Sequence, residues 1–320
     1  MKRINIYITE DTDQDIDNLS ELLQVNRSEI MRKAITEFSD KHASELDSFI
    51  EGLEDLSIEL PENNNRGHFL VECENNPEFF IENCLKINTI DEGISPFTLY
   101  KHQKHLLFKL DNYEKIVMNT SRQLGLSTLM TGYMLHYMIF NQHKNVVVVS
   151  PKQSQASEYV TQMRDMIERL PDFMKANLLS SVTKTRISFK NGSTFIASSA
   201  SVGGCRGMSI NYLFVDNFAH IPRSQADEFI ASIFPVITSN INSKIVVAST
   251  PDKPNHFYKM WTDAISNYNS FQAIKLPWYL METRDDEWEI NQKISLGEKT
   301  FGREFNCEFN YEMKGDLYAV

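Results

Sequence analysis

The residues whose types and spacing point most clearly to a chemical function lie in a loop between a predicted strand and a predicted helix. Residues 115–119 are predicted to form a strand, and residues 129–140 an apolar helix. A loop between two such elements binds phosphate, because its backbone amides and the start of the helix attract an anion. The loop sequence is Thr-Ser-Arg-Gln-Leu-Gly-Leu-Ser-Thr over residues 120–128. Leu126 stands where such loops carry a lysine, so the predicted site lacks its usual cation.

Further polar residues follow two other predicted strands. Asp216 ends the run Tyr-Leu-Phe-Val-Asp and fits the Walker B aspartate, whose carboxylate belongs to the shell of a Mg²⁺ ion. The next residue is usually a glutamate that orients the attacking water, and here it is Asn217. An amide can position a water molecule but cannot take its proton, so Asn217 cannot serve as general base. Ser249 and Thr250 end the other strand, where small hydroxyls suit the sensing of a γ-phosphate.

These residues need a sheet that brings the strand ends together. Residues 146–149, 212–215 and 245–248 are short apolar runs, which are typical of strands covered on both faces of a parallel sheet. Strands and helices alternate through the same region. The sequence therefore predicts an α/β fold, with a mostly parallel sheet flanked by helices, in a P-loop domain over residues 75–320.

The first residues predict a separate small module. Ile4, Ile6 and Ile8 alternate with polar residues, which is the pattern of a half-buried strand, and two amphipathic helices follow from Thr12 and Ser28. A single strand cannot stand alone and pairs most simply with the same strand of a second copy. The sequence therefore predicts a homodimer formed through this strand.

This order of elements, with Asn-Arg-Ser-Glu at the start of the second helix, resembles the ribbon-helix-helix DNA-binding family. The resemblance implies that the paired strands enter the major groove of double-stranded DNA, with Arg3, Asn5 and Tyr7 on base edges. The amides near Ser28 would hold a DNA phosphate. The alternative is a dimerisation module without DNA binding, which the five acidic residues between positions 10 and 17 favour.

Two boundaries follow from these patterns. We assign residues 1–45 to the ribbon-helix-helix-like module. Residues 46–74 are rich in acidic residues and asparagine and have a weak apolar pattern, so we assign them to a linker.

The second region resembles the ATPase domain of the tailed-phage large terminases, the DNA-packaging motors, over about residues 77–309. The matching segments include Leu-Tyr-Lys-His-Gln at 99–103, Thr-Ser-Arg-Gln-Leu-Gly at 120–125, Leu-Pro-Asp-Phe at 170–173 and Ser-Thr-Pro at 249–251. The resemblance implies a RecA-like P-loop fold that binds ATP and Mg²⁺. It also implies that the chain acts with phage packaging proteins on double-stranded DNA.

The family's functional residues are carried over by position. Gln103 resembles the glutamine that contacts adenine, and Arg122 the catalytic arginine of the phosphate loop. Ser127 and Asp216 resemble the Mg²⁺ ligands. The remaining assignments are Ser121, Gln123, Gly125, Leu126 and Thr128 for nucleotide binding, Asn217 for the degenerate catalytic position, and Ser249 and Thr250 for the motif that couples hydrolysis to movement.

Leu126 and Asn217 depart from the family pattern. Phosphoryl transfer depends on charge neutralisation and positioning, so both departures predict that ATP and Mg²⁺ bind weakly or not at all and that hydrolysis is poor or absent. Arg122 can supply one phosphate charge, and Asp227 and Glu228 are candidates to replace the missing carboxylate. The nuclease domain that follows the ATPase in this family is not expected before Val320.

Two other functions stay open at this point. One is an active packaging ATPase with a deviant phosphate loop, in which Arg122 supplies the positive charge for the phosphates. The other is a DNA-binding regulator in which the ATPase fold is only a scaffold, because a fold alone does not determine a function.

Composition excludes several classes of protein. With 42% hydrophobic residues, 12 glycines and 10 prolines in 320 residues, the chain can build a packed core and lacks the signature of disorder or collagen. The formal net charge of −11 means that no basic field covers the molecule, so contact with DNA must come from a local patch. The four cysteines show no metal-ligand spacing, and the sequence shows no targeting or membrane segment, so we expect a protein of the host cytoplasm.

Overall fold

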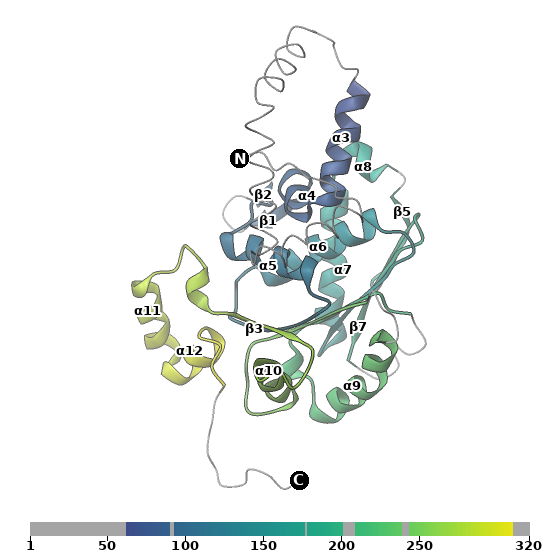
Figure 1. The fold of residues 1–320 in the computed structure, drawn as a ribbon. Helices are drawn as coiled ribbons and strands as arrows, with labels where there is room; N and C mark the ends of the chain where they lie inside the picture. The colour runs from purple at the N-terminus through teal and green to yellow at the C-terminus, as the bar shows by residue number, and fades with distance from the viewer. Residues whose placement is uncertain (1–61, 90–92, 177, 201–208, 239–242, 310–320) are drawn as a thin grey trace, which may run out of the picture. The chain divides into compact units, whose positions relative to one another are not determined.

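The part of the chain that the structure describes is organised around one sheet (Figure 1). The computed structural model describes residues 62–89, 93–176, 178–200, 209–238 and 243–309. The strands of the sheet, in spatial order, are β10 (Gln272–Leu276), β3 (Lys115–Thr120), β9 (Lys244–Ser249), β8 (Tyr212–Val215), β4 (Asn145–Ser150), β7 (Thr194–Ser199), β6 (Arg186–Phe189) and β5 (Leu179–Val182). Neighbouring strands from β10 to β7 are parallel, and β6 and β5 extend the sheet antiparallel. The predicted mostly parallel sheet is confirmed.

Both faces of the sheet are covered by apolar cores. In β4, Val146 and Val148 belong to the core on one face, whereas Val147 and Val149 belong to the core on the other. All four valines are fully buried. Successive residues of a strand point to opposite faces, so a continuous apolar run is what a strand between two cores requires.

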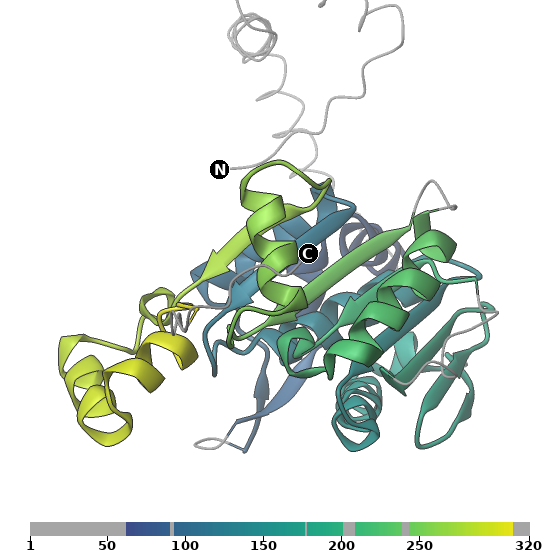
Figure 2. The same ribbon diagram turned by 90° about the horizontal axis from the view of Figure 1, so that it is seen from below.

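Helices on the two faces come from different parts of the chain (Figures 1 and 2). One face carries α3 (Glu62–Asn75), α4 (Pro77–Cys84), α5 (Lys101–Asn112), α6 (Leu126–Phe140), α7 (Gln153–Glu168) and α8 (Asp172–Lys175). The opposite face carries α9 (Arg223–Thr238) and α10 (His256–Ile265), with the short helix η1 (Phe218–His220). A small antiparallel hairpin, β1 (Lys86–Thr89) and β2 (Gly93–Pro96), follows α4.

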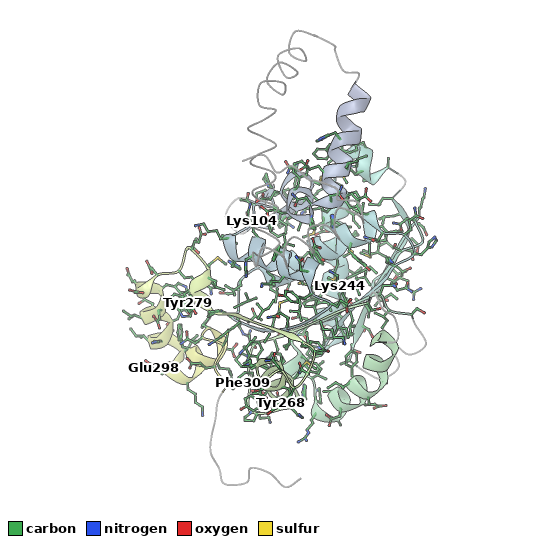
Figure 3. All side chains as sticks on the ribbon, in the orientation of Figure 1. Lys104, Lys244, Tyr268, Tyr279, Glu298 and Phe309 are labelled. Atoms are coloured by element: carbon green, nitrogen blue, oxygen red, sulfur yellow. The ribbon has the colours of Figure 1, made fainter. Side chains whose placement is uncertain are left out.

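Lys104 fixes the start of α5 against α4 (Figure 3). Its Nζ donates to Glu78 Oε1 at 2.8 Å and to Glu82 Oε2 at 3.0 Å, and these two carboxylates raise the pKa of Lys104. Glu82 also accepts a hydrogen bond from the backbone amide of Leu99 at 3.2 Å. The first turn of α5, which carries Gln103, is therefore anchored to α4.

The last described elements lie to one side of the sheet (Figures 1 and 2). They are η2 (Trp278–Leu280), α11 (Asp286–Leu296) and α12 (Glu298–Glu304). They share an aromatic cluster of Trp278, Trp288, Phe301 and Phe305. Asn119 Nδ2, near the end of β3, donates to the carbonyl of Cys307 at 2.9 Å, so the residues after α12 are tied to the strand that leads into the phosphate loop.

The predictions for the N-terminal module concern residues outside the described part of the chain. This applies to the strand, the dimer, and the DNA-binding residues Arg3, Asn5, Tyr7 and Ser28. The chain divides into two units, the second of which begins at Gly67. Helix α3 begins at Glu62, inside the segment that we assigned to a linker, and the weak apolar pattern there did not predict it. None of the described helices is long and apolar enough to span a membrane.

Candidate functional site

The register of three parallel strands brings the predicted site residues together. Asn119 of β3 lies beside Ser249 of β9, and Val215 of β8 lies beside Val247 of β9. The carboxyl ends of parallel strands share one edge of the sheet, where α/β proteins bind their ligands. A cavity of about 330 Å³ opens at this edge and is lined by Thr120, Ser121, Arg122, Gln123, Leu124, Gly125, Leu126, Ser127, Thr128, Asp216, Asn217, Ser249 and Thr250.

Gln103 supports the phosphate loop and does not line this cavity. Its Nε2 donates to the carbonyls of Leu124 at 3.3 Å and Gly125 at 3.4 Å, and its Oε1 accepts from the amide of Tyr100 at 3.0 Å. Gly125 has φ +69°, and a Cβ atom there would lie 2.7 Å from Gln103 Nε2. The loop therefore needs glycine at position 125, both for its backbone conformation and for the space taken by Gln103.

Leu126 opens helix α6 and is half-buried, with its side chain packed against the larger apolar core. The position that carries a lysine in other phosphate loops is therefore apolar in structure as well as in sequence. Among the described residues that line the cavity, Arg122 is the one with a cationic side chain.

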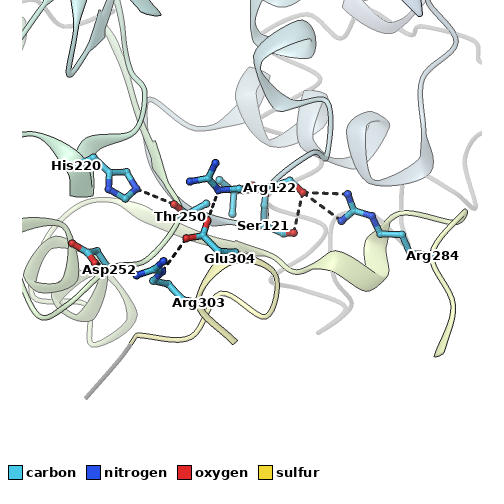
Figure 4. A network of polar contacts seen from close by, with 9 residues as sticks. Ser121, Arg122, His220, Thr250, Asp252, Arg284, Arg303 and Glu304 are labelled. Carbon is cyan, nitrogen blue, oxygen red and sulfur yellow. Dashed lines mark hydrogen bonds and ion pairs between the residues drawn. The ribbon is translucent and has the colours of Figure 1, made fainter. Parts of the chain in front are cut away.

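Arg122 is bound to α12, the last helix in the part of the chain that the structure describes (Figure 4). Its guanidinium Nε pairs with Glu304 Oε2, and its backbone amide donates to the Glu304 carbonyl at 3.0 Å. Glu304 Oε1 also accepts from Arg303 Nε at 2.9 Å. The Arg122 side chain is 59% exposed and that of Glu304 is 11% exposed, so the guanidinium remains accessible from the solvent side.

Arg284 holds the backbone of the same loop (Figure 4). Its guanidinium donates to the carbonyl of Arg122 at 3.3 and 3.4 Å and to that of Gln123 at 3.1 Å. Gln123 has a left-handed backbone with φ +60°, which is uncommon for a residue with a side chain. Hydrogen bonds from Arg284 to both carbonyls stabilise this turn of the loop.

Asp216 is held by hydrogen bonds from two side chains. Its Oδ2 accepts from the hydroxyl of Tyr159 at 2.8 Å and from Asn217 Nδ2 at 3.1 Å. Burial raises the pKa of the Asp216 carboxyl, and the hydrogen bond from Tyr159 partly offsets this rise. Asn217 has φ +54°, a conformation that asparagine tolerates better than most residues.

Ser249 and Thr250, which the sequence resemblance assigns to coupling, contact the segment that follows Asp216. Ser249 Oγ accepts from the backbone amide of Ala219 at 3.1 Å, and Thr250 Oγ1 lies 3.1 Å from His220 Nε2 (Figure 4). Burial lowers the pKa of His220. The end of β9 is therefore hydrogen-bonded to η1, the short helix that begins two residues after Asp216.

Several residues of the site were not predicted from the sequence. Glu304 lies 182 positions after Arg122, and no local pattern connects the two. Tyr159 and Gln162 lie one helical turn apart on α7, and nothing in the sequence pattern distinguishes them from other residues of an amphipathic helix. Neither of the candidate carboxylates Asp227 and Glu228 lines the cavity.

A second cavity of about 530 Å³ adjoins the first and shares Ser127, Thr128, Asp216 and Asn217 with it. The charged residues among its lining are Lys86, Glu158, Asp165, Arg169 and the shared Asp216. The carboxylates that adjoin the site thus come from α7, whereas Asp227 is 62% exposed and pairs with Arg223 at 3.7 Å.

Residues 117–315 match the family model for the terminase large subunit, T4likevirus-type, N-terminal. This match covers more than half of the chain and includes the whole lining of the first cavity. The chain belongs to the terminase large-subunit family. Residues 2–41 match the ribbon-helix-helix proteins of the copG family. Both predicted resemblances are confirmed.

Solved structures of phage large terminases share the fold. The ATPase domain of the Thermus phage P74-26 large terminase is 18% identical with a TM-score of 0.54, over 67% of this chain and 95% of that one. The HK97 bacteriophage large terminase is 18% identical with a TM-score of 0.60, over 74% of this chain and 55% of that one. The large terminase of a thermophilic bacteriophage, solved in complex with ADP, is 14% identical with a TM-score of 0.51, over 66% of this chain and 54% of that one.

Asp216→Asn should stabilise the protein at neutral pH, because an amide keeps a hydrogen-bond acceptor for Tyr159 and removes a buried charge. We expect Tm to rise by about 2–4 °C, which corresponds to about 1 kcal/mol in a domain of this size. The folded-state pKa of Asp216 lies above its unfolded value, so the cost of its ionisation is greatest at neutral pH. The difference in Tm should therefore shrink as the pH falls toward about 4.

Asp172→Asn is the matched control. Asp172 is exposed and pairs with Lys175 at 2.7 Å, so this substitution should leave Tm unchanged or lower it slightly. A lower Tm for Asp216→Asn than for the unmodified chain at neutral pH would contradict this prediction, because it would show that the ionised carboxylate does not destabilise the folded state.

Proposed function

We propose that this chain holds a nucleotide at its phosphate loop and hydrolyses it poorly or not at all. The observation that carries the proposal is the charge around the loop. Leu126 stands at the lysine position, and Arg122, the one cation among the described residues that line the 330 Å³ cavity, shares its charge with Glu304. Phosphate groups bind through charge-assisted hydrogen bonds, so a site with one shared cation binds them weakly.

The residue type at position 217 supports slow hydrolysis. Asn217 lies beside Asp216 and donates a hydrogen bond to it, which is the opposite of the role of a proton acceptor. The two carboxylates suggested as substitutes, Asp227 and Glu228, do not line the cavity. The position that usually activates water is therefore occupied by an amide, which cannot take a proton.

Relatives of the same fold support nucleotide as the ligand class. The large terminase of the thermophilic bacteriophage was solved with ADP and with ATP-gamma-S. In this chain the helix start at Leu126 and the amides of the loop offer the same kind of anion site. Gln103 can contact adenine only if its amide leaves the carbonyls of Leu124 and Gly125.

We further propose that the N-terminal segment binds double-stranded DNA as a dimer and that the terminase domain contacts phage packaging proteins in the host cytoplasm. The family matches over residues 2–41 and 117–315 support both parts. A chain with a terminase fold and little turnover could regulate an active packaging motor by taking a position in its ring.

Leu126→Lys tests the charge argument. A lysine at the start of α6 restores a cation beside the phosphates, so nucleotide affinity should rise at least about tenfold, or about 1.4 kcal/mol. The measurement is titration with a fluorescent ATP analogue, together with thermal unfolding with and without Mg²⁺-ATP, since a ligand of the folded state raises Tm. Adding Asn217→Glu to this variant should produce phosphate release that neither single variant shows.

Leu126→Met controls for the change of side-chain shape and should give no gain. Rapid phosphate release by the unmodified chain, lost in Arg122→Ala, would contradict the proposal and favour an active ATPase served by Arg122. A complete lack of ligand-induced stabilisation in both the unmodified chain and Leu126→Lys would favour a scaffold without a nucleotide site.

Arg3→Ala tests the DNA interface of the N-terminal segment. Loss of a base-edge contact should weaken binding to a cognate duplex by about 1–3 kcal/mol. The measurement is fluorescence anisotropy with labelled duplex DNA at several salt concentrations, after selection of a preferred sequence. Lys184→Ala, which removes an exposed cation between β5 and β6, is the control and should leave the affinity unchanged. Equal losses in both variants would mean that DNA binds through diffuse charge on the second unit.

A further inference from the structure

The carboxylate of Asp216 is held through one of its two oxygens. Oδ2 accepts a hydrogen bond from the Tyr159 hydroxyl at 2.8 Å and another from Asn217 Nδ2 at 3.1 Å. Among the described residues, no side chain hydrogen-bonds the other oxygen, Oδ1. The backbone is fixed as well, because the Asp216 amide donates to the carbonyl of Val149 at 2.8 Å. The carboxylate therefore has a defined rotation, with Oδ2 occupied and Oδ1 available to a ligand.

Tyr159, which holds Oδ2, comes from a different element and is itself fixed by packing. It belongs to α7, whereas Asp216 follows β8. The residue is 4% exposed, and its ring packs edge-on against Phe214 of β8 with the ring centroids 5.8 Å apart. One helical turn further along α7, Gln162 Nε2 donates to Thr128 Oγ1 at 2.9 Å. Helix α7 thus contacts both the residue that follows β8 and the first turn of α6.

The residues present fit a Mg²⁺ ion where the two cavities meet. Ser127 and Asp216, to which the family resemblance assigns the metal, line both cavities. Mg²⁺ prefers oxygen ligands and is usually bound by one or two carboxylates together with phosphate oxygens and water molecules. A carboxylate that binds a metal is commonly held by a hydrogen bond from a neighbouring group, which sets its orientation. The two hydrogen bonds to Oδ2 leave Oδ1 for that purpose.

We infer that Tyr159 is a positioning residue, whose hydroxyl holds Asp216 so that Oδ1 stays available to the divalent cation of a bound nucleoside polyphosphate. The phenol restricts rotation of the carboxylate and acts on the metal only through Asp216. The inference rests on the proposed nucleotide site and adds the residue that orients its carboxylate ligand. The alternative is a phenol that only satisfies a buried carboxylate, and this alternative is one outcome of the test.

Tyr159→Phe tests this role, because it keeps the ring and removes only the hydroxyl. The affinity of the full chain for mant-ADP is measured by fluorescence titration in excess Mg²⁺ and in excess EDTA. We expect the unmodified chain to bind at least about tenfold more tightly in Mg²⁺. In Tyr159→Phe the affinity in Mg²⁺ should fall about tenfold, the scale of losing a residue that orients a metal ligand. The affinity in EDTA should change by less than about twofold, because the phenol acts through the metal ligand.

Tyr212→Phe is the matched control. The Tyr212 hydroxyl is buried and has no hydrogen-bond partner among the described residues, so the same substitution there should leave both affinities unchanged. Equal losses in Mg²⁺ and in EDTA for Tyr159→Phe would show that the phenol only supports the packing of the site, and would overturn the inference. Retention of the full Mg²⁺ dependence by Tyr159→Phe, or equal binding in both conditions by the unmodified chain, would also overturn it.

Titration with Mn²⁺ alone separates this inference from the proposed function. Mn²⁺ bound at Asp216 should broaden the amide NMR signal of the adjacent Asn217. We expect this broadening in the unmodified chain, its loss in Asp216→Asn, and a need for about tenfold more Mn²⁺ in Tyr159→Phe. This pattern in a chain that binds no nucleotide would contradict the proposed function and support the role of Tyr159. No broadening in the unmodified chain, or equal broadening in Tyr159→Phe, would overturn the inference.

Discussion

The parallel register of β3, β9 and β8 is the constraint on which the site depends. Three loops far apart in the sequence meet only because these strands end at one edge of the sheet, with Asn119 beside Ser249 and Val215 beside Val247. The buried apolar runs fix that register, since each strand must satisfy a core on both of its faces. The chemistry of the site is therefore positioned by residues that take no part in it.

Hydrogen bonds and one ion pair, all within the chain, engage the polar side chains of the candidate site. Leu126 packs into the core, Glu304 engages Arg122, and Tyr159 and Asn217 donate to Asp216. These polar contacts engage Arg122 and Asp216, the two residues that the proposed function assigns to phosphate and to Mg²⁺. Under the proposed function, the chain keeps the terminase fold, and these contacts hold the loop in place without the groups that speed phosphoryl transfer.

The sequence was sufficient for the fold because its apolar runs and its loop have local signatures. The strands 145–150, 212–215 and 244–249 follow from apolar runs of four residues each, and the helix after Gly125 follows from the loop motif. The contacts within the candidate site could not be predicted from the sequence in the same way. Glu304 contacts Arg122 although the two residues lie 182 positions apart in the sequence. Tyr159 contacts Asp216 from a helix with an apolar stripe, and that stripe alone would explain Tyr159 as a core residue. Only tertiary packing distinguishes such a residue from its neighbours.

Single-turnover hydrolysis by the unmodified chain tests most directly whether the site holds a nucleotide without cleaving it. Labelled ATP is mixed with excess protein, with and without Mg²⁺, and the bound nucleotide is collected by rapid filtration and identified over time. Retention of intact ATP, released slowly and unchanged, is the predicted result. Conversion of the bound ATP to ADP and phosphate, abolished by Asp216→Ala, would contradict it and identify a working motor domain.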